Sequence, residues 1–210
     1  MADKNGDLIL RHTPGERVSH WIVSLVFVFL FLSGLAMFHP FFFWLSFLFG
    51  GGQFMRWLHP FAGVLLAVLF YQYATWVWAD NKWLPADTEW RRNMWKYMRL
   101  ETHSPEGTGK YNAGQKLMFW SMVPLIAVLF VTGIVLWQPW FAPYFGPGLR
   151  RLAGLLHAAA AFIMFVGIGI HWYAAYWTRG SVRAMVRGKV TRAWAKYHFP
   201  GWYREVAGKE

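Results

Sequence analysis

The chain alternates between long uncharged apolar runs and polar segments that carry most of its charge. The apolar runs lie at Trp21 to Phe38, Phe61 to Ala79, Leu117 to Trp137 and Leu152 to Trp177. The first three contain no charged residue, and the fourth is interrupted only by histidines and small residues. A helix needs about 20 mostly apolar residues to cross the hydrocarbon core of a bilayer. The pattern therefore predicts four transmembrane helices.

These runs place the spans at about 18–39, 56–79, 115–138 and 150–178, in a single integral-membrane domain covering residues 1–210. The segment 80–114 is then a polar loop and 179–210 a polar tail. Phe41 to Phe49 is apolar but too short to span, so we expect an interfacial helix or hairpin there. We also expect an amphipathic helix around Trp90 to Leu100, and a surface helix in the tail before Pro200.

Composition supports a membrane protein. The chain is 56% hydrophobic and 15% charged, whereas soluble domains carry about 25% charged residues. A soluble domain of this length must still face much of its surface to water, so lipid is the simpler solvent for this excess. The absence of cysteine excludes disulfides, thiolate zinc sites, cysteine-ligated iron–sulfur clusters and the attachment motif of c-type haem. The predicted fold class is an all-α membrane protein.

Lysine and arginine predict the orientation. Of the 21 basic residues, 18 lie in the N-terminal segment, the 80–116 segment or the C-terminal tail. The opposite side carries Arg56, Arg150 and Arg151. Cytoplasmic loops of membrane proteins are enriched in Lys and Arg, so both termini are expected in the cytoplasm. Residues 1–17 are polar and have no apolar core, so we expect no removable signal peptide.

Four histidines fall near the ends of the predicted spans. His20 and His171 lie at cytoplasmic ends, whereas His59 and His157 lie at outer ends. His157 and His171 are separated by 14 residues in the sequence. That separation is nearly four helical turns, or about 21 Å along the axis, so both side chains project from one face. Depth then pairs His20 with His171 on the inner side and His59 with His157 on the outer side.

Paired histidines at two depths are typical of two haems held between helices. Bis-histidine ligation would suit electron transfer, because it leaves no open position on the iron. Glycines at 34, 63 and 167 lie near these histidines and could make room for a flat macrocycle, although glycine is also common at plain helix contacts. A proton path or a transporter site would use intramembrane histidines as well, and a lone histidine at a membrane boundary is more often an interfacial polar residue.

Seven stretches give the chain a resemblance that covers nearly its whole length. They are ERVSHW (16–21), LHPFAG (58–63), GKYNAGQK (109–116), VTGIVLWQPWFAP (131–143), LLHAAA (155–160), HWYAAYW (171–177) and AWAKYHFPGWYRE (193–205). Their order and spacing resemble the cytochrome b (gamma) subunit of membrane-bound, quinone-linked formate dehydrogenases. The resemblance implies a four-helix bundle with two b haems.

The family's haem ligands fall on His20, His59, His157 and His171. The resemblance also implies a quinone site beside the inner haem, formed by His171 with three residues of the loop entering the third span, namely Asn112, Gly114 and Gln115. Taken locally, Asn-Ala-Gly before a helix is also ordinary capping and turn chemistry.

By resemblance, the partners are an iron–sulfur (beta) subunit and a molybdenum or tungsten catalytic (alpha) subunit. The chain would carry electrons across the bacterial inner membrane to menaquinone or ubiquinone, without oxidising a substrate alone. A cytochrome b of a nickel–iron hydrogenase or a thiosulfate reductase would share these features. A small proton channel or transporter is the alternative from another class.

Overall fold

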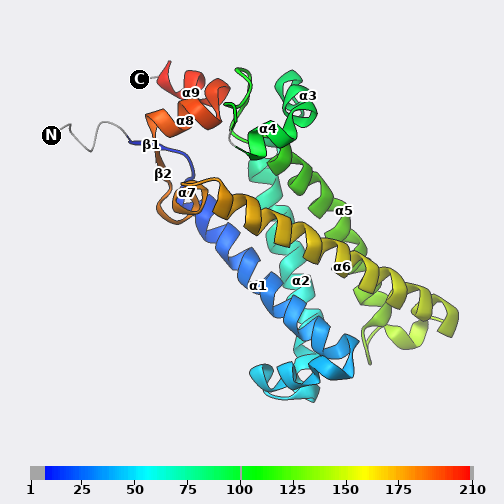
Figure 1. Ribbon diagram of the computed structural model, residues 1–210. Helices are drawn as coiled ribbons and strands as arrows, with labels where there is room; N and C mark the ends of the chain where they lie inside the picture. The colour runs from blue at the N-terminus through cyan, green and yellow to red at the C-terminus, as the bar shows by residue number, and fades with distance from the viewer. Residues whose placement is uncertain (1–7, 100, 209–210) are drawn as a thin grey trace. The chain divides into compact units, whose positions relative to one another are not determined.

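Four long helices dominate the chain in the computed structural model, which describes residues 8–99 and 101–208. They are α1 (Pro14–Phe38), α2 (Gly52–Val77), α5 (Ala113–Leu136) and α6 (Pro147–Trp177) (Figure 1). All four are long and apolar enough to cross a membrane, which confirms the four predicted helices. Each begins two to four residues before the predicted span, because the polar first turn of a helix can extend beyond an apolar run.

The remaining elements are short. They are β1 (Leu8–Leu10), η1 (Pro40–Phe49), η2 (Ala79–Asn81), α3 (Pro85–Arg92), α4 (Met94–Met98), η3 (Ala142–Tyr144), α7 (Ser181–Arg187), β2 (Lys189–Thr191), α8 (Arg192–His198) and α9 (Pro200–Ala207). The apolar 41–49 segment is a 3-10 helix and not a hairpin, and it ends at Gly50, whose φ is +78°. The predicted all-α class is confirmed, with β1 and β2 as a short strand pair beside the helices.

The amphipathic helix predicted around Trp90 to Leu100 is wrong as a single element. The structure has two helices there, α3 and α4, separated at Asn93. The backbone N–H of Asn93 donates to the carbonyls of Glu89 and Trp90 and so closes α3. Asparagine favours such turns because its short polar side chain competes with helical hydrogen bonding. Leu100 lies outside the described residues.

The chain divides into two compact units. The first, here called the loop-and-tail unit, contains the described residues of 8–18, 75–120 and 169–208, and the second, the transmembrane unit, contains 19–74 and 121–168.

In the transmembrane unit, side-chain contacts between neighbouring helices close a ring. Phe31 of α1 stacks on Phe165 of α6, with ring centroids 4.5 Å apart. Tyr71 of α2 donates its hydroxyl to the carbonyl of Val123 in α5 at 2.7 Å. Two further pairs, described below, join α1 to α2 and α5 to α6. The ring order is therefore α1–α2–α5–α6, which places α2 diagonally opposite α6.

Large apolar side chains cover the outside of this unit. Leu25, Val68 and Phe162 are 69%, 60% and 67% exposed. Apolar surface on this scale is rare on soluble monomers, and it is the surface expected where a protein meets lipid. Between α1 and α2, the 3-10 helix η1 is anchored by a small buried cluster of Ala36, Leu45 and Met55.

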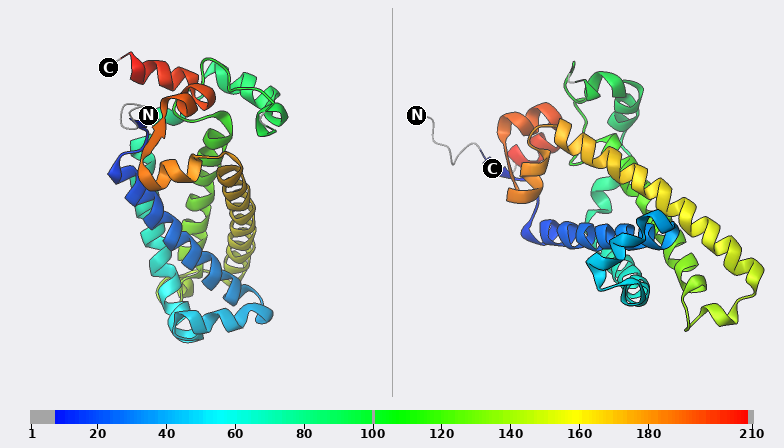
Figure 2. Two further views of the ribbon diagram at one scale, coloured as in Figure 1. Left: turned by 60° about the vertical axis from the view of Figure 1, so that its left-hand side comes forward. Right: turned by 60° about the horizontal axis from the view of Figure 1, so that its bottom comes forward.

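In the loop-and-tail unit, the N-terminal segment is attached to the C-terminal tail. Strands β1 and β2 pair antiparallel, with Ile9 opposite Val190; Figure 2 shows α8 and α9 following in succession. The amides of Arg11 and His12 both donate to the carbonyl of Gly188. Gly188 has a φ of +77°, and a Cβ there would lie 2.7 Å from the His12 carbonyl oxygen. Only glycine satisfies both constraints at this position.

Arg11 is the centre of this attachment. Its side chain is 4% exposed, and its guanidinium lies 3.7 Å from the Phe199 ring centre and 4.9 Å from that of Trp202. It donates to the carbonyl of Lys110 at 2.6 Å. Burial lowers the pKa of Arg11 to about 10, with partial compensation from the nearby Tyr111, Glu16 and Asp80, so the guanidinium stays charged at neutral pH. Cation–π contacts of this kind stabilise by about 1–2 kcal/mol when desolvated.

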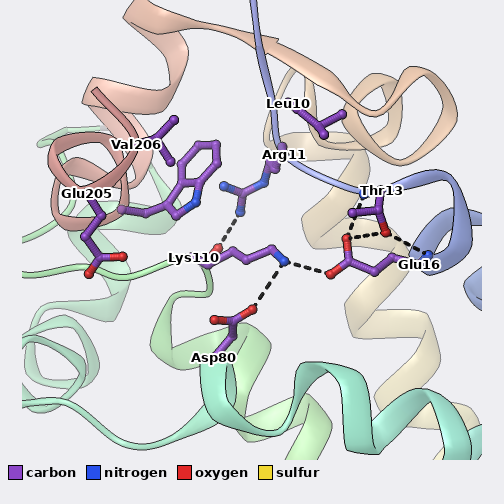
Figure 3. Close-up of a pocket in the computed structure, with 9 residues that line it drawn as sticks. Leu10, Arg11, Thr13, Glu16, Asp80, Lys110, Glu205 and Val206 are labelled. Atoms are coloured by element: carbon purple, nitrogen blue, oxygen red, sulfur yellow. Dashed lines mark hydrogen bonds and ion pairs between the residues drawn. The ribbon is translucent and has the colours of Figure 1, made fainter. Parts of the chain in front are cut away.

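Lys110 lies at the centre of a charged network. Its Nζ is 2.7 Å from Glu16 Oε1 and 3.2 Å from Asp80 Oδ2, at the edge of a pocket of about 290 Å³ (Figure 3). Glu16 also caps α1, because its carboxylate accepts from the Thr13 amide while the Thr13 hydroxyl accepts from the Glu16 amide. This reciprocal capping box fixes the start of the first long helix.

A second ion pair in this unit is fully buried. Lys116 Nζ lies 2.6 Å from Asp87 Oδ2, and the two side chains are 0% and 1% exposed. Lys116 also donates to the carbonyl of Lys82 at 2.8 Å, and Asp87 accepts from the Leu84 amide at 2.7 Å. The pair therefore joins the first turn of α5 to the start of α3.

Replacing Lys116 by Met should destabilise the protein by about 3–5 kcal/mol, because it leaves the Asp87 carboxylate buried without its counter-ion. Thermal unfolding in detergent measures the effect. Lys96→Met, on an exposed lysine of α4, is the matched control and should change little. The double variant Lys116→Met with Asp87→Leu should recover much of the loss, and no recovery would show that the pair is not the cause.

The tail should also lose stability in acid. Burial, with a smaller effect of Arg11, lowers the pKa of His198 from 6.5 to about 4. Below pH 6.5 the unfolded tail binds a proton that the folded tail does not, so stability is full above pH 6.5 and falls as the pH drops to 4. The loss is at most on the order of 3 kcal/mol. Hydrogen exchange of 189–207 at pH 7.5 and 5, corrected for intrinsic rates, measures it. His198→Phe should abolish the dependence, whereas His103→Phe should preserve it.

Candidate haem site

Two of the four candidate histidines lie within the transmembrane unit on diagonally opposite helices. His59 is on α2 and His157 is on α6. Both residues belong to the transmembrane unit. The structure therefore places both members of the predicted outer pair inside one unit.

His59 is held by α1. Its Nδ1 lies 2.7 Å from the hydroxyl oxygen of Ser33, which is completely buried. A Cβ on the next residue, Gly34, would lie 3.5 Å from the Cε1 atom of His59. The Ser-Gly dipeptide therefore faces the imidazole with both residues: the Ser33 hydroxyl contacts the ring nitrogen, and Gly34 lies beside the ring edge without a side chain.

His157 is held in the same way by α5. Its Nδ1 lies 2.8 Å from the hydroxyl oxygen of Thr132, which is 7% exposed. A Cβ on Gly133 would lie 3.5 Å from the Cε1 atom of His157. A hydroxyl residue followed by glycine thus supports each imidazole from a neighbouring helix.

The hydroxyl protons determine which nitrogen of each ring is free. Thr132 Oγ1 lies 2.6 Å from the Val128 carbonyl oxygen, a contact that requires the hydroxyl proton between the two oxygens. Ser33 donates to the Leu30 carbonyl at 3.2 Å. With each hydroxyl proton assigned to its helix carbonyl, each oxygen accepts from the imidazole. This assignment places the ring proton on Nδ1 and leaves Nε2 of both rings with the lone pair that binds a metal.

Sequence reasoning missed Ser33, Thr132 and Gly133 as parts of the site. It noted Gly34 as one of three glycines near the histidines, and the structure places Gly34 beside His59. The available signal was a hydroxyl residue followed by glycine within an uncharged span, once in each half of the chain. Which imidazole such a pair contacts depends on the rotation of the helices, which the periodicity of one helix does not give.

The inner pair belongs to two units. His20, on α1, is in the transmembrane unit, and its ring meets Trp21 edge-on with centroids 5.5 Å apart. His171, on α6, is in the loop-and-tail unit. The pairing of His20 with His171 therefore stays a prediction.

The three loop residues predicted to bind quinone lie in the loop-and-tail unit at the start of α5. The backbone N–H of Asn112 donates to the side-chain oxygen Oε1 of Gln115, and the backbone N–H of Gln115 donates to the side-chain oxygen Oδ1 of Asn112, both at 3.0 Å. This is a capping box, which commits both side-chain oxygens to the helix terminus. A Cβ on Gly114 would lie 3.1 Å from the Trp90 ring, so packing alone favours glycine there. The side-chain NH₂ groups of Asn112 and Gln115 are the donors that this box does not use.

Comparisons with known proteins give one consistent result. A family model described as prokaryotic cytochrome b561 matches residues 11–188. The formate dehydrogenase cytochrome b556 subunit of Haemophilus influenzae is 40% identical over 96% of this chain and 84% of the relative. The cytochrome b556(Fdn) subunit of the nitrate-inducible formate dehydrogenase of Escherichia coli K12 is 42% identical over 97% and 94%. The b556(fdo) subunit of the same organism is 41% identical over 97% and 95%.

A b-type haem is compatible with the residues at the outer pair. The donor set is two neutral imidazoles, each with Nε2 available. A Cβ on Gly63, one helical turn after His59, would meet no heavy atom within 4 Å among the described residues. The helix surface beside this ligand is therefore open to a flat group. His59 and His157 would hold the haem, and the haem would supply one-electron chemistry without an open iron position.

The capping box itself can be tested. Asn112→Ala should destabilise the start of α5 by about 1 kcal/mol, because the Gln115 amide loses its acceptor. Asn112→Asp keeps an oxygen in the same position and should preserve stability. Hydrogen exchange at residues 113–116 measures both effects. Equal protection in Asn112→Ala and the unmodified protein would show that the cap contributes nothing.

Proposed function

Because this chain belongs to the prokaryotic cytochrome b561 family, we propose that it is the membrane cytochrome b of a formate:quinone oxidoreductase. It is a bacterial membrane protein whose full-length relatives are formate dehydrogenase subunits, and its family implies haem b. The chain would receive electrons from an iron–sulfur subunit of the complex and deliver them to quinone. The observation that carries this proposal is the pair His59 and His157, on diagonal helices with both Nε2 atoms available.

We assign two haems to the chain. The outer haem is held by His59 and His157, and the inner haem by His20 and His171, on the depth argument of the sequence. The Lys and Arg bias puts the termini, the 80–114 loop and the tail in the cytoplasm of an inner-membrane protein. The chain then carries electrons inward against a negative-inside potential, which stores about 2.3 kcal/mol per charge per 100 mV.

Quinone would bind on the cytoplasmic side at Asn112, Gly114, Gln115 and His171. The capping box supports this role in a specific way. It uses the two side-chain oxygens and leaves two NH₂ groups, and a quinone carbonyl requires donors. Protons for the reduction would come from the cytoplasm.

The relatives' names favour formate over the other donors considered. Cytochromes b of hydrogenases and thiosulfate reductases share the expected architecture, but the full-length relatives reported above are subunits of formate dehydrogenases. A proton channel is not favoured, because the chain belongs to a cytochrome family. The intact complex, purified with its partner subunits, should therefore reduce a quinone analogue with formate and not with hydrogen.

The haem assignment predicts a selective loss. In the complex, His157→Ala should remove the outer haem and leave the inner one, which would halve the reduced b-type α-band and stop electron transfer from formate to quinone. Formate oxidation with an artificial acceptor at the partner subunit should persist. His39→Ala, outside the proposed ligand set, is the control. Absence of any b-type α-band in the unmodified complex would refute the function.

The quinone assignment predicts that capping and binding can be separated. Asn112→Asp keeps the acceptor that caps α5 and removes the NH₂ donor. We expect quinone reduction to fall about tenfold, as for the loss of one hydrogen bond worth about 1.4 kcal/mol, while both haems are still reduced by formate. Asn112→Ser, which also caps without an NH₂ group, should behave like Asn112→Asp. Normal quinone kinetics in both variants would exclude Asn112 from the site.

A further inference from the structure

We propose that Ser33 and Thr132 are positioning residues for the outer haem: they hold both axial imidazoles in one tautomer and thereby set its reduction potential. This inference rests on the proposed outer haem. It concerns two hydroxyls that touch the ligands and not the iron, at positions that the sequence patterns did not single out.

The first step is the direction of the hydrogen bonds. Within α5 the Thr132 proton is used by the Val128 carbonyl, four residues back, at 2.6 Å. Within α1 the Ser33 proton is used by the Leu30 carbonyl, three residues back, at 3.2 Å. Such back-bonding to the helix is common for buried Ser and Thr. It fixes where the oxygen lone pairs point, so the imidazole Nδ1–H groups meet an acceptor and not another donor.

The second step is burial. Ser33 is 0% and Thr132 is 7% exposed, and both lie in helices that would cross the membrane. An imidazole N–H there has no bulk water as a substitute acceptor. Loss of the hydroxyl therefore removes the acceptor that the ring nitrogen contacts, and the ring can then rotate or change tautomer. The hydroxyls of Ser33 and Thr132 are the side chains that contact Nδ1 of the two rings.

The third step is the effect on the iron. A hydrogen bond from Nδ1–H to an acceptor makes the imidazole a more basic ligand, and a more basic ligand stabilises ferric over ferrous iron. A neutral hydroxyl does this more weakly than a carboxylate and places no extra charge inside the membrane, where an unpaired charge is costly. A hydroxyl contacts Nδ1 of both His59 and His157, so the two contacts would change the reduction potential in the same direction.

The experiment is a redox titration of the intact complex. Ser33→Ala and Thr132→Val remove the acceptors, and Thr132→Val keeps the volume of the side chain. The potential of the outer haem, followed in the α-band, should shift upward in each variant. The low-spin ferric signal of that haem in electron paramagnetic resonance should change, and haem retention should fall about tenfold. The inner haem should keep its potential.

The control variants keep the hydroxyl or remove an unrelated one. Ser33→Thr and Thr132→Ser should retain the unmodified potential. Ser24→Ala removes another hydroxyl of α1, one that donates to the His20 carbonyl, and should leave the outer potential unchanged.

Each outcome decides the inference. An unmodified potential and ferric signal in both Ser33→Ala and Thr132→Val, with haem bound, would overturn it. If Ser33→Ala binds no outer haem, retention in Ser33→Thr supports the proposal, whereas loss in both points to packing and contradicts it. Failure of the proposed function looks different, because the unmodified complex would then show no outer haem at all.

Discussion

Inside a bilayer a polar group must find its partner within the protein, because the hydrocarbon core contains no water. The transmembrane unit follows this constraint at three of its helix contacts. The Tyr71 hydroxyl donates to the Val123 carbonyl, and the hydroxyls of Ser33 and Thr132 each bond both a helix carbonyl and an imidazole. These bonds join α1 to α2, α2 to α5 and α5 to α6, and they also orient the two histidines, whereas the fourth contact, between α1 and α6, is the apolar stack of Phe31 on Phe165.

His59 and His157 are each oriented by a hydroxyl from a neighbouring helix. On α2 and α6 they lie diagonally across the ring, with the supporting hydroxyls on α1 and α5. Each ligand is therefore held by a helix that carries no ligand of the outer pair. With Nδ1 facing the hydroxyl, Nε2 of each ring is the nitrogen left for the proposed outer haem.

The loop-and-tail unit combines ion pairs with an apolar cluster that includes Ile9 and Val190. Lys110 lies between Glu16 and Asp80, and Lys116 is buried against Asp87. Arg11 lies among aromatic rings of the tail and bonds the carbonyl of Lys110. The residue after Lys110 and Tyr111 is Asn112, the N-cap of α5. The same segment that carries the charged network therefore also carries the proposed quinone donors, which ties their position to the attachment of the N-terminal segment.

The sequence by itself determined the four long helices, because lipid requires uncharged apolar runs of a set length and the chain has four. It also predicted the depth of the histidines, and its Asn-Ala-Gly run indicated the capping at Asn112, because capping is local. Only the tertiary structure decided which side chains meet. The pairing of Ser33 with His59 and of Thr132 with His157 depends on how each helix is rotated against its neighbour. The contact between the Arg11 guanidinium and the Phe199 ring joins residues nearly 190 positions apart in the sequence. The break at Asn93 shows the same limit within one segment. The amphipathic sequence pattern continues past Asn93, but the backbone N–H and the side-chain NH₂ of Asn93 both bond the Glu89 carbonyl, and α3 ends there.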